Sequence, residues 1–347
     1  MQQKSSIFIT GANGFAGTYT TYRLLKMGYR VVALKRERSN LETSKYIFEY
    51  LNARDGAHVS FSEIEWRLGD TLDPFSLVEH SKGCAAIVHM AASVSFQKNE
   101  REQILKNNIE SAANAVNAAI ENGIKRFIQL SSVAALPNPD KKSELDENFL
   151  NSTFYQFETT YGESKYRSEM EMWRGLGEGL NVTALNPGII IGPWKFTGSS
   201  VEMFKTVQNG LPFYSSGLTG FVGVEDVAKA VLATLQNDGT IGQRYVLVSE
   251  NWSYKAFLEA IAKSLNKKPP KIKAGKNLSQ VVAKVSELWS TVTGTKAFIT
   301  TEMAQSANRK THFINKKAVS DLKLSFTPLA DSINETAQFL KQNPNLI

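Results

Sequence analysis

The chain has 347 residues, of which 42% are hydrophobic and 21% charged, values that suit one large domain with a lobe or two domains. With 23 glycines, 10 prolines and no short repeat, the composition excludes collagen, a coiled-coil rod and a low-complexity chain. The single cysteine, Cys84, can form neither an intramolecular disulfide nor a thiolate metal cluster. No signal peptide and no run of about 18 apolar residues is found, so we expect a cytoplasmic protein without a membrane span.

The formal net charge of +7 belongs to the end of the chain. Residues 251–347 hold 15 Lys and Arg against 6 Asp and Glu, whereas residues 1–250 hold 25 against 27. The most basic run, residues 267–276, is typical of a solvated loop; the alternative is a patch that meets an anionic ligand, a phospholipid or nucleic acid. No recognisable nucleic-acid-reading element accompanies it, so we expect no nucleic-acid partner.

Short apolar runs alternate with longer stretches of helical period through the first 250 residues. The predicted strands are 7–10, 31–34, 64–68, 86–89, 127–131, 182–186 and 245–248, and the predicted helices are 15–27, 44–53, 103–121 and 161–176. This alternation predicts an α/β protein with a Rossmann-type, doubly wound parallel sheet. Gly28 and Gly123 follow two of the helices, where a residue at positive φ ends a helix.

After residue 250 the alternation stops, which predicts a smaller, mostly C-terminal substrate-binding lobe. We assign residues 1–187 to the dinucleotide-binding domain, completed by 218–250, and residues 188–217 and 251–347 to the lobe. Within the lobe, apolar residues at helical spacing in 277–293 predict a helix that packs on it, with a membrane-surface helix as the alternative.

A glycine-rich turn follows the first predicted strand and opens the first helix. Gly11 can make the tight turn, Gly14 lets the backbone approach a pyrophosphate, and Gly17 lets the helix press on the strand. The helix N-terminus then offers free N–H groups to the phosphates. The turn therefore predicts a dinucleotide site, with Asn13, Phe15 and Ala16 as further contacts.

Cations follow the second predicted strand, where an NAD-binding protein would place an acid for the ribose 2′-hydroxyl. Lys35 and Arg36 suit a 2′-phosphate instead, and Arg38 can assist them. We therefore expect NADP, with Arg36 as its main reader. Glu37 leaves NAD as the alternative.

Tyr161 and Lys165 are four residues apart, which places them one turn apart on the same face of a helix. A free tyrosine titrates near pH 10, and a neighbouring ammonium favours the phenolate and lowers that pKa. Ser132 follows the fifth predicted strand, at the carboxyl edge where open α/β sheets bind ligands. We expect these three residues to be catalytic, with Tyr161 as the general acid or base.

At this point the chain resembles the extended short-chain dehydrogenase/reductase family, of the NAD-dependent epimerase/dehydratase type, over nearly its whole length. The matching motifs are the Gly11 turn, residues 69–73, 89–92, 107–109, 130–132, the Tyr161 motif, and residues 186–188 with Gly192 and Pro193. The family usually has Arg-Pro-Gly where this chain has Asn186, Pro187 and Gly188, so the contacts of Asn186 stay open.

The resemblance implies roles for further residues. Asp70 and Thr71 would contact adenine, Ala91 and Ala92 would lie along the pyrophosphate and ribose, and Pro187 and Ile190 would border the nicotinamide. Lys165 would also bind the nicotinamide ribose, Ser132 would bind substrate, and Asn107 would serve the cofactor side or a proton relay. Candidate substrate-pocket residues are Ser93, Phe96, Trp194 and Phe196.

Arg36 and residues 221–228 most resemble the dihydroflavonol reductase branch. The resemblance implies an NADP-dependent oxidoreductase that reduces a ketone or aldehyde of a hydrophobic small molecule. The alternatives are a nucleotide-sugar epimerase or dehydratase with tightly bound NAD, a membrane-associated sterol dehydrogenase, and an NADPH-binding scaffold without chemistry. Many relatives dimerise through the helices that begin at Gln103 and Tyr161, so a homodimer is expected.

Other tempting residues have simpler interpretations. His89 at a strand end and Cys84 in a turn are expected to be structural. The four histidines are too widely spaced for a metal site, so no metal is expected.

Overall fold

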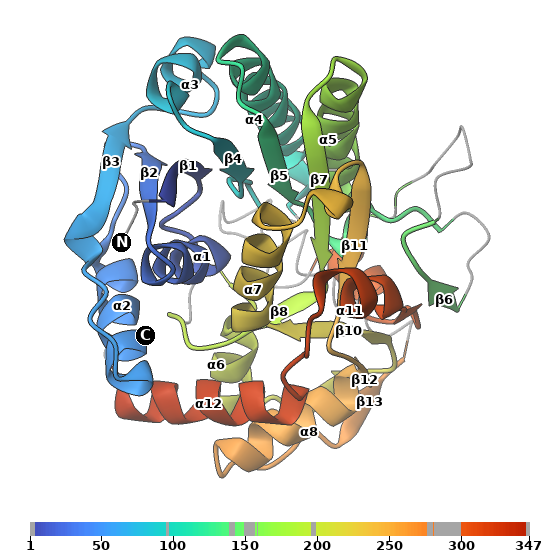
Figure 1. The fold of residues 1–347 in the computed structure, drawn as a ribbon. Helices are drawn as coiled ribbons and strands as arrows, with labels where there is room; N and C mark the ends of the chain where they lie inside the picture. Colours follow the sequence, from blue (N-terminus) through green and yellow to red (C-terminus); the bar gives the residue numbers. More distant parts are fainter. Residues whose placement is uncertain are drawn as a thin grey trace.

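Seven parallel strands form the central sheet, in the order β11-β7-β5-β4-β1-β2-β3 (Figure 1). The structure is a computed structural model that describes residues 4–94, 97–138, 143–148, 157, 159–195, 199–275, 280 and 300–344. The strands are β1 (Lys4–Thr10), β2 (Tyr29–Lys35), β3 (Ile64–Leu68), β4 (Ala86–His89), β5 (Arg126–Leu130), β7 (Asn181–Pro187) and β11 (Gln243–Leu247). From β1 the chain winds outward first to β3 and then to β11, which confirms the predicted doubly wound Rossmann-type sheet.

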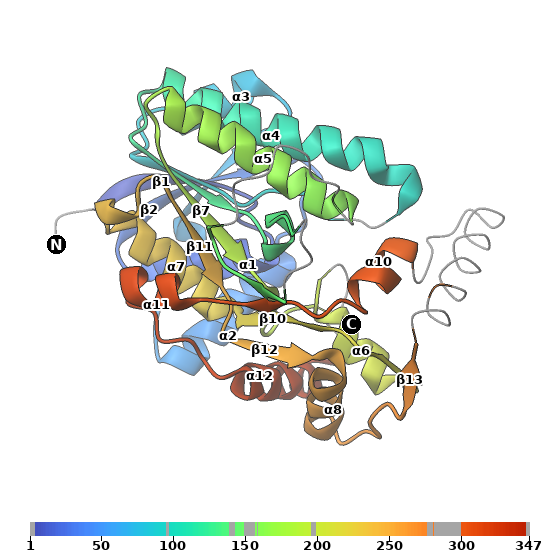
Figure 2. The ribbon, with the colours of Figure 1, turned by 90° about the vertical axis from the view of Figure 1, so that its right-hand side faces the viewer.

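The sheet is buried on both faces, as a parallel sheet requires. The helices α1 (Phe15–Lys26), α2 (Glu42–Asp55) and α7 (Val224–Leu235) cover one face, and α3 (Pro74–Ser81), α4 (Arg101–Glu121) and α5 (Thr160–Gly177) cover the other (Figure 2). Adjacent residues of β1 therefore serve different cores: Phe8 packs with the α3–α5 layer and Ile9 with the α1–α7 layer. Gly28 and Gly123 have φ of 82° and 61°, as predicted for the ends of α1 and α4.

Two helices of these layers were not among the predicted ones. The helix α3 has only eight residues, and its start is marked by the Asp73 side chain, which accepts from Phe75 N, and by Pro74 at the first helical position. The helix α7 carries a buried stripe at helical spacing, Val224, Val227, Ala228 and Val231, so helical period could have found it.

The remaining elements build a second layer below the sheet. They include a three-stranded sheet of β8 (Ile189–Ile191), β10 (Leu218–Gly223) and β12 (Glu250–Ser253), two paired strands β9 (Phe213–Ser215) and β13 (Ile272–Ala274), and the pair β6 (Glu144–Leu145) and β14 (His312–Phe313). Its helices are α6 (Glu202–Gln208), α8 (Tyr254–Ser264), α10 (Thr301–Ser306), α11 (Lys316–Leu322) and α12 (Leu329–Gln342). Short 3₁₀ turns lie next to strands and helices of the central sheet domain: η1 (Phe61–Glu63), η2 (Lys98–Glu100), η3 (Val133–Ala135) and η4 (Asp238–Thr240). The domain division at residue 187 stays a prediction, and all but one residue of the helix predicted over 277–293 lies outside the described residues.

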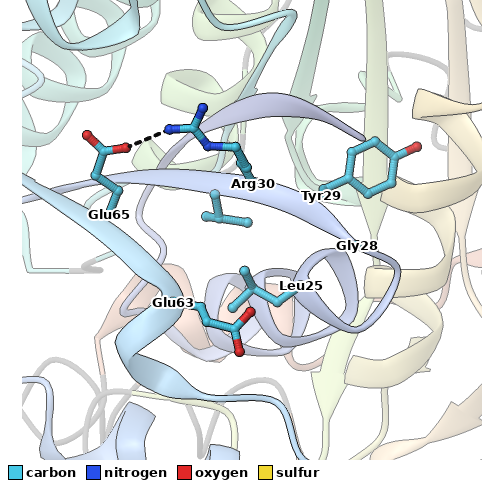
Figure 3. Close-up of a pocket in the computed structure, with 7 residues that line it drawn as sticks. Leu25, Gly28, Tyr29, Arg30, Glu63 and Glu65 are labelled. Carbon is cyan, nitrogen blue, oxygen red and sulfur yellow. Dashed lines mark ion pairs between the residues drawn. The ribbon is translucent and has the colours of Figure 1, made fainter. Parts of the chain in front are cut away.

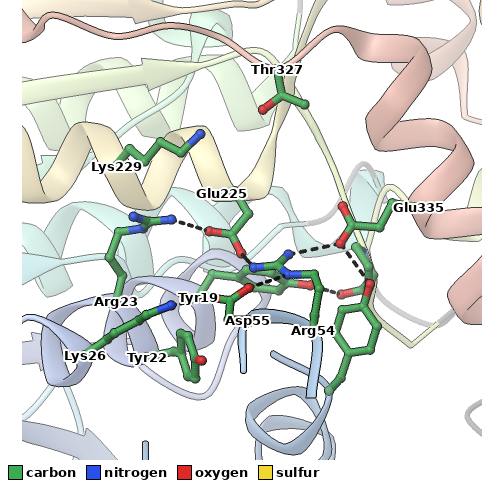
Figure 4. Close-up of polar contacts among 12 residues, drawn as sticks. Tyr19, Tyr22, Arg23, Lys26, Arg54, Asp55, Glu225, Lys229, Thr327 and Glu335 are labelled. Carbon is green, nitrogen blue, oxygen red and sulfur yellow. Dashed lines mark hydrogen bonds and ion pairs between the residues drawn. The ribbon is translucent and has the colours of Figure 1, made fainter. Parts of the chain in front are cut away.

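The end of the chain returns to the sheet domain through α12, which runs beside α2 (Figure 1). Phe339 is buried, and its ring lies 6.0 and 4.9 Å from the rings of Tyr46 and Tyr50 on α2. A polar cluster joins the same elements (Figure 4): Arg54 of α2 donates to Glu225 of α7 at 2.6 Å and to Glu335 of α12 at 3.0 Å. Within the part of the chain that the structure describes, no helix is long and apolar enough to cross a lipid bilayer.

A second contact, made by a fully buried carboxylate, holds the segment that leads into α12. The carboxylate of Asp226 on α7 accepts from Thr327 N at 2.7 Å, from Thr327 Oγ1 at 3.2 Å and from Lys229 Nζ at 2.7 Å. The side chain of Asp226 is 0% exposed. Loss of this carboxylate would leave the part-buried Thr327 N–H and Lys229 without their acceptor.

We predict that Asp226→Ala lowers the free energy of unfolding by about 2 to 3 kcal/mol, because part-buried donors lose a charged acceptor and a cavity replaces a fully buried side chain. Urea denaturation followed by circular dichroism measures the change. Glu259→Ala is the matched control: its ion pair with Lys255, at 3.7 Å, is exposed, so its loss should change stability by less than about 0.5 kcal/mol. An equal effect of the two variants would contradict this role of Asp226.

Candidate active site

The predicted site residues gather at the carboxyl edge of the sheet. Gly11 follows β1, Ala91 and Ala92 follow β4, and Ser132 follows β5. Lys35 and Pro187 end β2 and β7, and Asp70 lies two residues beyond β3. Because parallel strands all end at the same edge, the topology brings these residues together where open α/β sheets bind ligands.

The glycine turn is built by two close approaches of the backbone. Gly11 has φ of +73°, and a Cβ placed on it would lie 2.7 Å from Ala91 N. A Cβ on Gly17 would lie 2.0 Å from the carbonyl oxygen of Gly11, so only glycine lets α1 pack on the turn. The helix begins after Gly14 without a side-chain cap, which leaves the N–H groups of its first turn available. Asn13, Phe15 and Ala16 belong to the same turn, and the whole fits a pyrophosphate.

Thr10 holds the two strand ends beside this turn, a role that the sequence reasoning missed. Its Oγ1 accepts from Met90 N and Ala91 N, each at 3.2 Å, and lies 2.9 Å from His89 Nδ1. Burial, with the charge of Lys165, lowers the pKa of His89 to about 3, so the ring is neutral. The sequence did hold a signal for this role, because Thr10 is the last residue of β1 and directly precedes Gly11.

At the same edge of the sheet, where β2 ends, Lys35 is half-buried and Arg36 is exposed. A short turn, in which Ser39 N donates to the carbonyl oxygen of Arg36 at 3.0 Å, follows them. Thr71 lies next to Asp70, whose carboxylate accepts from Leu72 N at 3.1 Å. Neither Lys35 nor Arg36 forms an ion pair with another described residue, so both cations are available to an anion.

Tyr161, Lys165 and Ser132 lie together because α5 approaches the end of β5 closely. A Cβ on Gly162 would lie 2.7 Å from the carbonyl oxygen of Ala134, which follows Ser132. The Ser132 hydroxyl hydrogen-bonds Tyr161. Lys165 is 6% exposed, donates from Nζ to the carbonyl oxygen of Leu130 at 3.0 Å, and lies 6.0 Å from the centre of the Tyr161 ring.

The expected lowering of the Tyr161 pKa is wrong for this structure. Burial raises the pKa of Tyr161 to about 12, and the hydrogen bond with Ser132 only partly opposes that rise. Helical spacing shows that Lys165 is a neighbour, but it does not show how deeply the phenol is buried or that the ammonium binds the Leu130 carbonyl. The phenol therefore keeps its proton at neutral pH, as a proton donor must.

Burial shifts the pKa of Lys165 below that of an exposed lysine. Burial lowers the pKa of Lys165 to about 8, and the carboxylate of Glu169, one turn further along α5, opposes that change. Asn186 lies beneath the same helix and donates from Nδ2 to the carbonyl oxygen of Ser132 at 2.9 Å and to Glu169 Oε1 at 2.6 Å. These contacts answer what Asn186 does in place of the arginine of the family motif.

The asparagine next to the predicted one makes the buried contacts. Asn107 is half-buried and accepts from Gln103 Nε2 on its own helix at 2.5 Å. Asn108 is buried, exchanges hydrogen bonds with the backbone of Ser93 at 2.7 and 2.9 Å, and donates to Ser164 Oγ at 3.0 Å. Helical period could have found Asn108, because it lies in register with the buried stripe of Ile104, Ser111 and Ala112.

Of the candidate substrate residues, Phe96 and Phe196 lie outside the described residues. Ser93 is exposed beyond β4, and its backbone is fixed by Asn108. Trp194 is only 3% exposed and stacks on Phe15, with ring centres 5.4 Å apart. Trp194 is thus part of the core behind the glycine helix, Ile190 is half-buried and Pro187 is buried.

The C-terminal layer touches α5 directly, which no sequence signal indicated. Glu302 of α10 accepts from Thr160 N at 3.0 Å and from Thr160 Oγ1 at 2.8 Å, at the first residue of α5. Arg101 of α4 donates to the same Thr160 Oγ1 at 3.1 Å. A carboxylate at a helix N-terminus is stabilised by the free N–H groups and the helix dipole.

A half-open pocket of about 280 Å³ lies elsewhere, between the end of α1 and the starts of β2 and β3 (Figure 3). Arg30 and Glu65 form an ion pair across it at 3.6 Å. It belongs to the amino edge of the sheet, opposite the site. Among the described residues no group of His, Cys, Asp and Glu is arranged to hold a metal ion, and burial raises the pKa of Cys84 to about 11.

Comparison with known proteins connects this geometry to chemistry. A family model described as the NAD dependent epimerase/dehydratase family matches residues 7–247, from β1 to β11. A Synechocystis sp. protein, provisionally named a dihydroflavonol 4-reductase, is 26% identical over 341 residues, which cover 97% of this chain and 94% of the relative. Sterol demethylase protein B of Methylococcus capsulatus is 27% identical over 278 residues, 79% of each chain.

A yeast enzyme matches in both sequence and structure. The NADPH-dependent methylglyoxal reductase of Saccharomyces cerevisiae is 25% identical over 285 residues, 74% of this chain and 81% of the relative. Its crystal structure, a complex with NADPH, superposes with a TM-score of 0.73 at 20% identity and covers 99% of this chain and 100% of that one. This likeness shows the shared fold.

The buried Lys165 predicts a pH-dependent stability. Its pKa is about 8 in the folded state against about 10.5 when unfolded, so the unfolded chain binds more protons between these values and the free energy of unfolding rises with pH there. We predict that wild type gains about 2 to 3 kcal/mol relative to Lys165→Met between pH 7 and pH 10.5. Urea denaturation of the nucleotide-free proteins at steps of one pH unit measures this; parallel curves would contradict it.

Proposed function

We propose, from the premise that this chain belongs to the NAD-dependent epimerase/dehydratase family, that it reduces a ketone or aldehyde of a hydrophobic small molecule with NADPH. The family and its reductase relatives make the chain an NAD(P)-dependent oxidoreductase of the extended short-chain dehydrogenase/reductase type. The observation that carries the finer proposal is the contact of Ser132 with a half-buried Tyr161 whose phenol keeps its proton beside Lys165.

The proposed chemistry gives each of these groups a defined role. Bound at the glycine turn, the nicotinamide dinucleotide supplies the hydride. The hydroxyls of Ser132 and Tyr161 hold the carbonyl oxygen, and Tyr161 donates its proton to that oxygen as negative charge develops on it. The ammonium of Lys165 then favours the phenolate that remains until a proton returns.

The choice of NADP is supported by the cations at the end of β2. Arg36 is exposed and Lys35 half-buried, and neither pairs with a described acid, so both can meet a 2′-phosphate. The yeast relative is named an NADPH-dependent enzyme, which agrees with this preference. Asp70, Thr71, Ala91, Ala92, Pro187 and Ile190 complete the proposed dinucleotide site, and Asn107 stays a predicted relay residue.

The specific alternatives concern how the dinucleotide is used and where the protein acts. An epimerase or dehydratase would recycle a tightly bound NAD with the same tyrosine and lysine, and the family takes its name from such enzymes. The Methylococcus relative keeps a sterol substrate among the hydrophobic candidates. The homodimer through α4 and α5, which pack side by side (Figure 2), and the cytoplasmic location stay predictions.

The deciding experiment identifies the nucleotide that the purified protein releases on denaturation, by mass spectrometry, together with NADPH and NADH titrations. Weakly bound NADP(H), or an empty site that prefers NADPH, is expected of a reductase that exchanges its cofactor at every turnover. Stoichiometric, tightly held NAD would overturn the proposal in favour of an epimerase or dehydratase. Sedimentation with anionic liposomes separates the membrane-associated case.

We predict that Tyr161→Phe lowers kcat for reduction of a panel of aromatic and aliphatic carbonyl compounds by about 10² to 10⁴, because the general acid is lost. The dissociation constant of NADPH should stay within about twofold of wild type, as measured by fluorescence titration. Tyr29→Phe is the control, since it removes a phenol hydroxyl at the amino edge of the sheet. Turnover that survives in Tyr161→Phe would require another acid.

We predict that Arg36→Asp raises the dissociation constant of NADPH by about 10- to 100-fold and changes that of NADH by less than about threefold, because only the 2′-phosphate loses a charged partner. Arg30→Asp makes the same charge change at the opposite edge of the sheet and should leave both constants unchanged. An equal loss for the two nucleotides in Arg36→Asp would refute the role of Arg36.

A further inference from the structure

A buried ion pair lies directly behind the catalytic residues. Glu169 follows Tyr161 and Lys165 at intervals of four residues, so the three share one face of α5. Its carboxylate is 0% exposed and is paired with Arg244 of β11, whose side chain is 3% exposed. Arg244 Nε donates to Glu169 Oε2 at 2.8 Å, and Nη2 donates to the same oxygen.

The second oxygen of this carboxylate connects the pair to the site. Asn186 of β7 donates from Nδ2 both to Glu169 Oε1, at 2.6 Å, and to the carbonyl oxygen of Ser132, at 2.9 Å. Lys165 donates to the carbonyl oxygen of Leu130, two residues before Ser132. The chain of contacts from Arg244 to Ser132 therefore fixes the end of β5 on which both the hydroxyl and the ammonium depend.

Stability alone is a weak reason for such a pair. Removing two charges from water costs several kcal/mol per ion, and well-packed apolar residues often replace a buried ion pair without loss of stability. The negative charge of Glu169 favours the charged form of Lys165, which is only 6% exposed and therefore poorly hydrated. Arg244, whose guanidinium also lies 5.7 Å from the ring of Trp173, balances the carboxylate from the far side.

We propose that Glu169 is a positioning residue of the active site, whose carboxylate, held by Arg244 and Asn186, keeps the buried Lys165 charged and the Ser132 backbone in place. This inference rests on the proposed function for the roles of Lys165 and Tyr161. The groups facing Lys165 are Tyr161 and Glu169 on α5, the neutral His89 on β4 and the Leu130 carbonyl on β5. The groups facing Glu169 are Arg244 on β11 and Asn186 on β7.

The two partners make opposite predictions for Lys165. Glu169→Gln removes the negative charge and leaves the guanidinium of Arg244, so the ammonium should lose its proton at a lower pH. Arg244→Gln leaves the carboxylate unopposed, so the ammonium should keep its proton to a higher pH. A merely structural pair would give no such opposition, because either variant would loosen the same packing.

The experiment follows the proton on Lys165 itself. Protein labelled with ¹³C at lysine Cε is titrated by NMR without nucleotide, and the Lys165 signal is identified as the one missing from Lys165→Met. The wild-type midpoint is expected near pH 8. Glu169→Gln should lower it by about one pH unit, Arg244→Gln should raise it, and the charge-conserving Arg244→Lys should return it toward wild type.

Controls separate the charge effect from a loss of structure. Glu225→Gln makes the same substitution in the Arg23 and Arg54 cluster and should leave the Lys165 midpoint unchanged. If Glu169→Gln does not fold, Glu169→Leu combined with Arg244→Leu removes both charges while keeping an apolar core. The midpoint should still fall, because Glu169 is the charge that raises the pKa of Lys165. Shifts of the two single variants in the same direction, or an unchanged midpoint in the double variant, would overturn the proposal.

The titration is independent of the proposed reaction. It uses neither substrate nor nucleotide. A protein that reduces no carbonyl compound in the panel would refute the proposed function, whereas the role of Glu169 would still be decided by the titration midpoints of Lys165. If carbonyl reduction is observed, the fall of kcat/KM at high pH should move to lower pH in Glu169→Gln and to higher pH in Arg244→Gln. A lower kcat/KM with an unmoved pH profile would also contradict the role of Glu169.

Discussion

An ammonium group buried in a protein needs oxygen atoms around it. For Lys165 these oxygens must come from α5 and from the strands packed against it. The carbonyl of Leu130 gives it one partner, and the carboxylate of Glu169 lies one turn away on the same helix. The buried carboxylate in turn needs Arg244, which comes from the edge strand β11. This single charged group thus accounts for buried polar side chains on three elements, Glu169 on α5, Asn186 on β7 and Arg244 on β11.

The sequence predicts the strands of the central sheet well because each strand is marked by a pattern of neighbouring residues. Strands buried on both faces are short apolar runs, and all seven central strands were found with ends that differ by at most three residues. The parallel topology then places the glycine turn, Ser132 and Pro187 at one edge without further information. The same local logic distinguishes Asn108 from Asn107, since helical period alone assigns the first to the buried side of α4.

The features that the sequence could not predict depend on how deeply a side chain is buried and on contacts between residues far apart in the chain. The rise of the Tyr161 pKa follows from burial, which the spacing of Tyr161 and Lys165 does not report. Arg244, which pairs with Glu169, and Glu302, which accepts from Thr160, lie 75 and 142 positions away from these partners, in segments without a motif. Trp194 was assigned to the substrate pocket from its position, whereas its stacking on Phe15 places it in the core.

The contacts of residues 300–344 with the sheet domain have a consequence for synthesis on the ribosome. When translation reaches residue 300, all seven strands and every recognised motif have already been made. The N-terminus of α5 still lacks Glu302, and α2 still lacks the cover of Phe339. At about 5 to 20 residues per second the missing segment takes about 2 to 9 s to make. The nascent chain therefore spends seconds with all seven strands made, while the N-terminus of α5 and the aromatic face of α2 still lack their C-terminal partners.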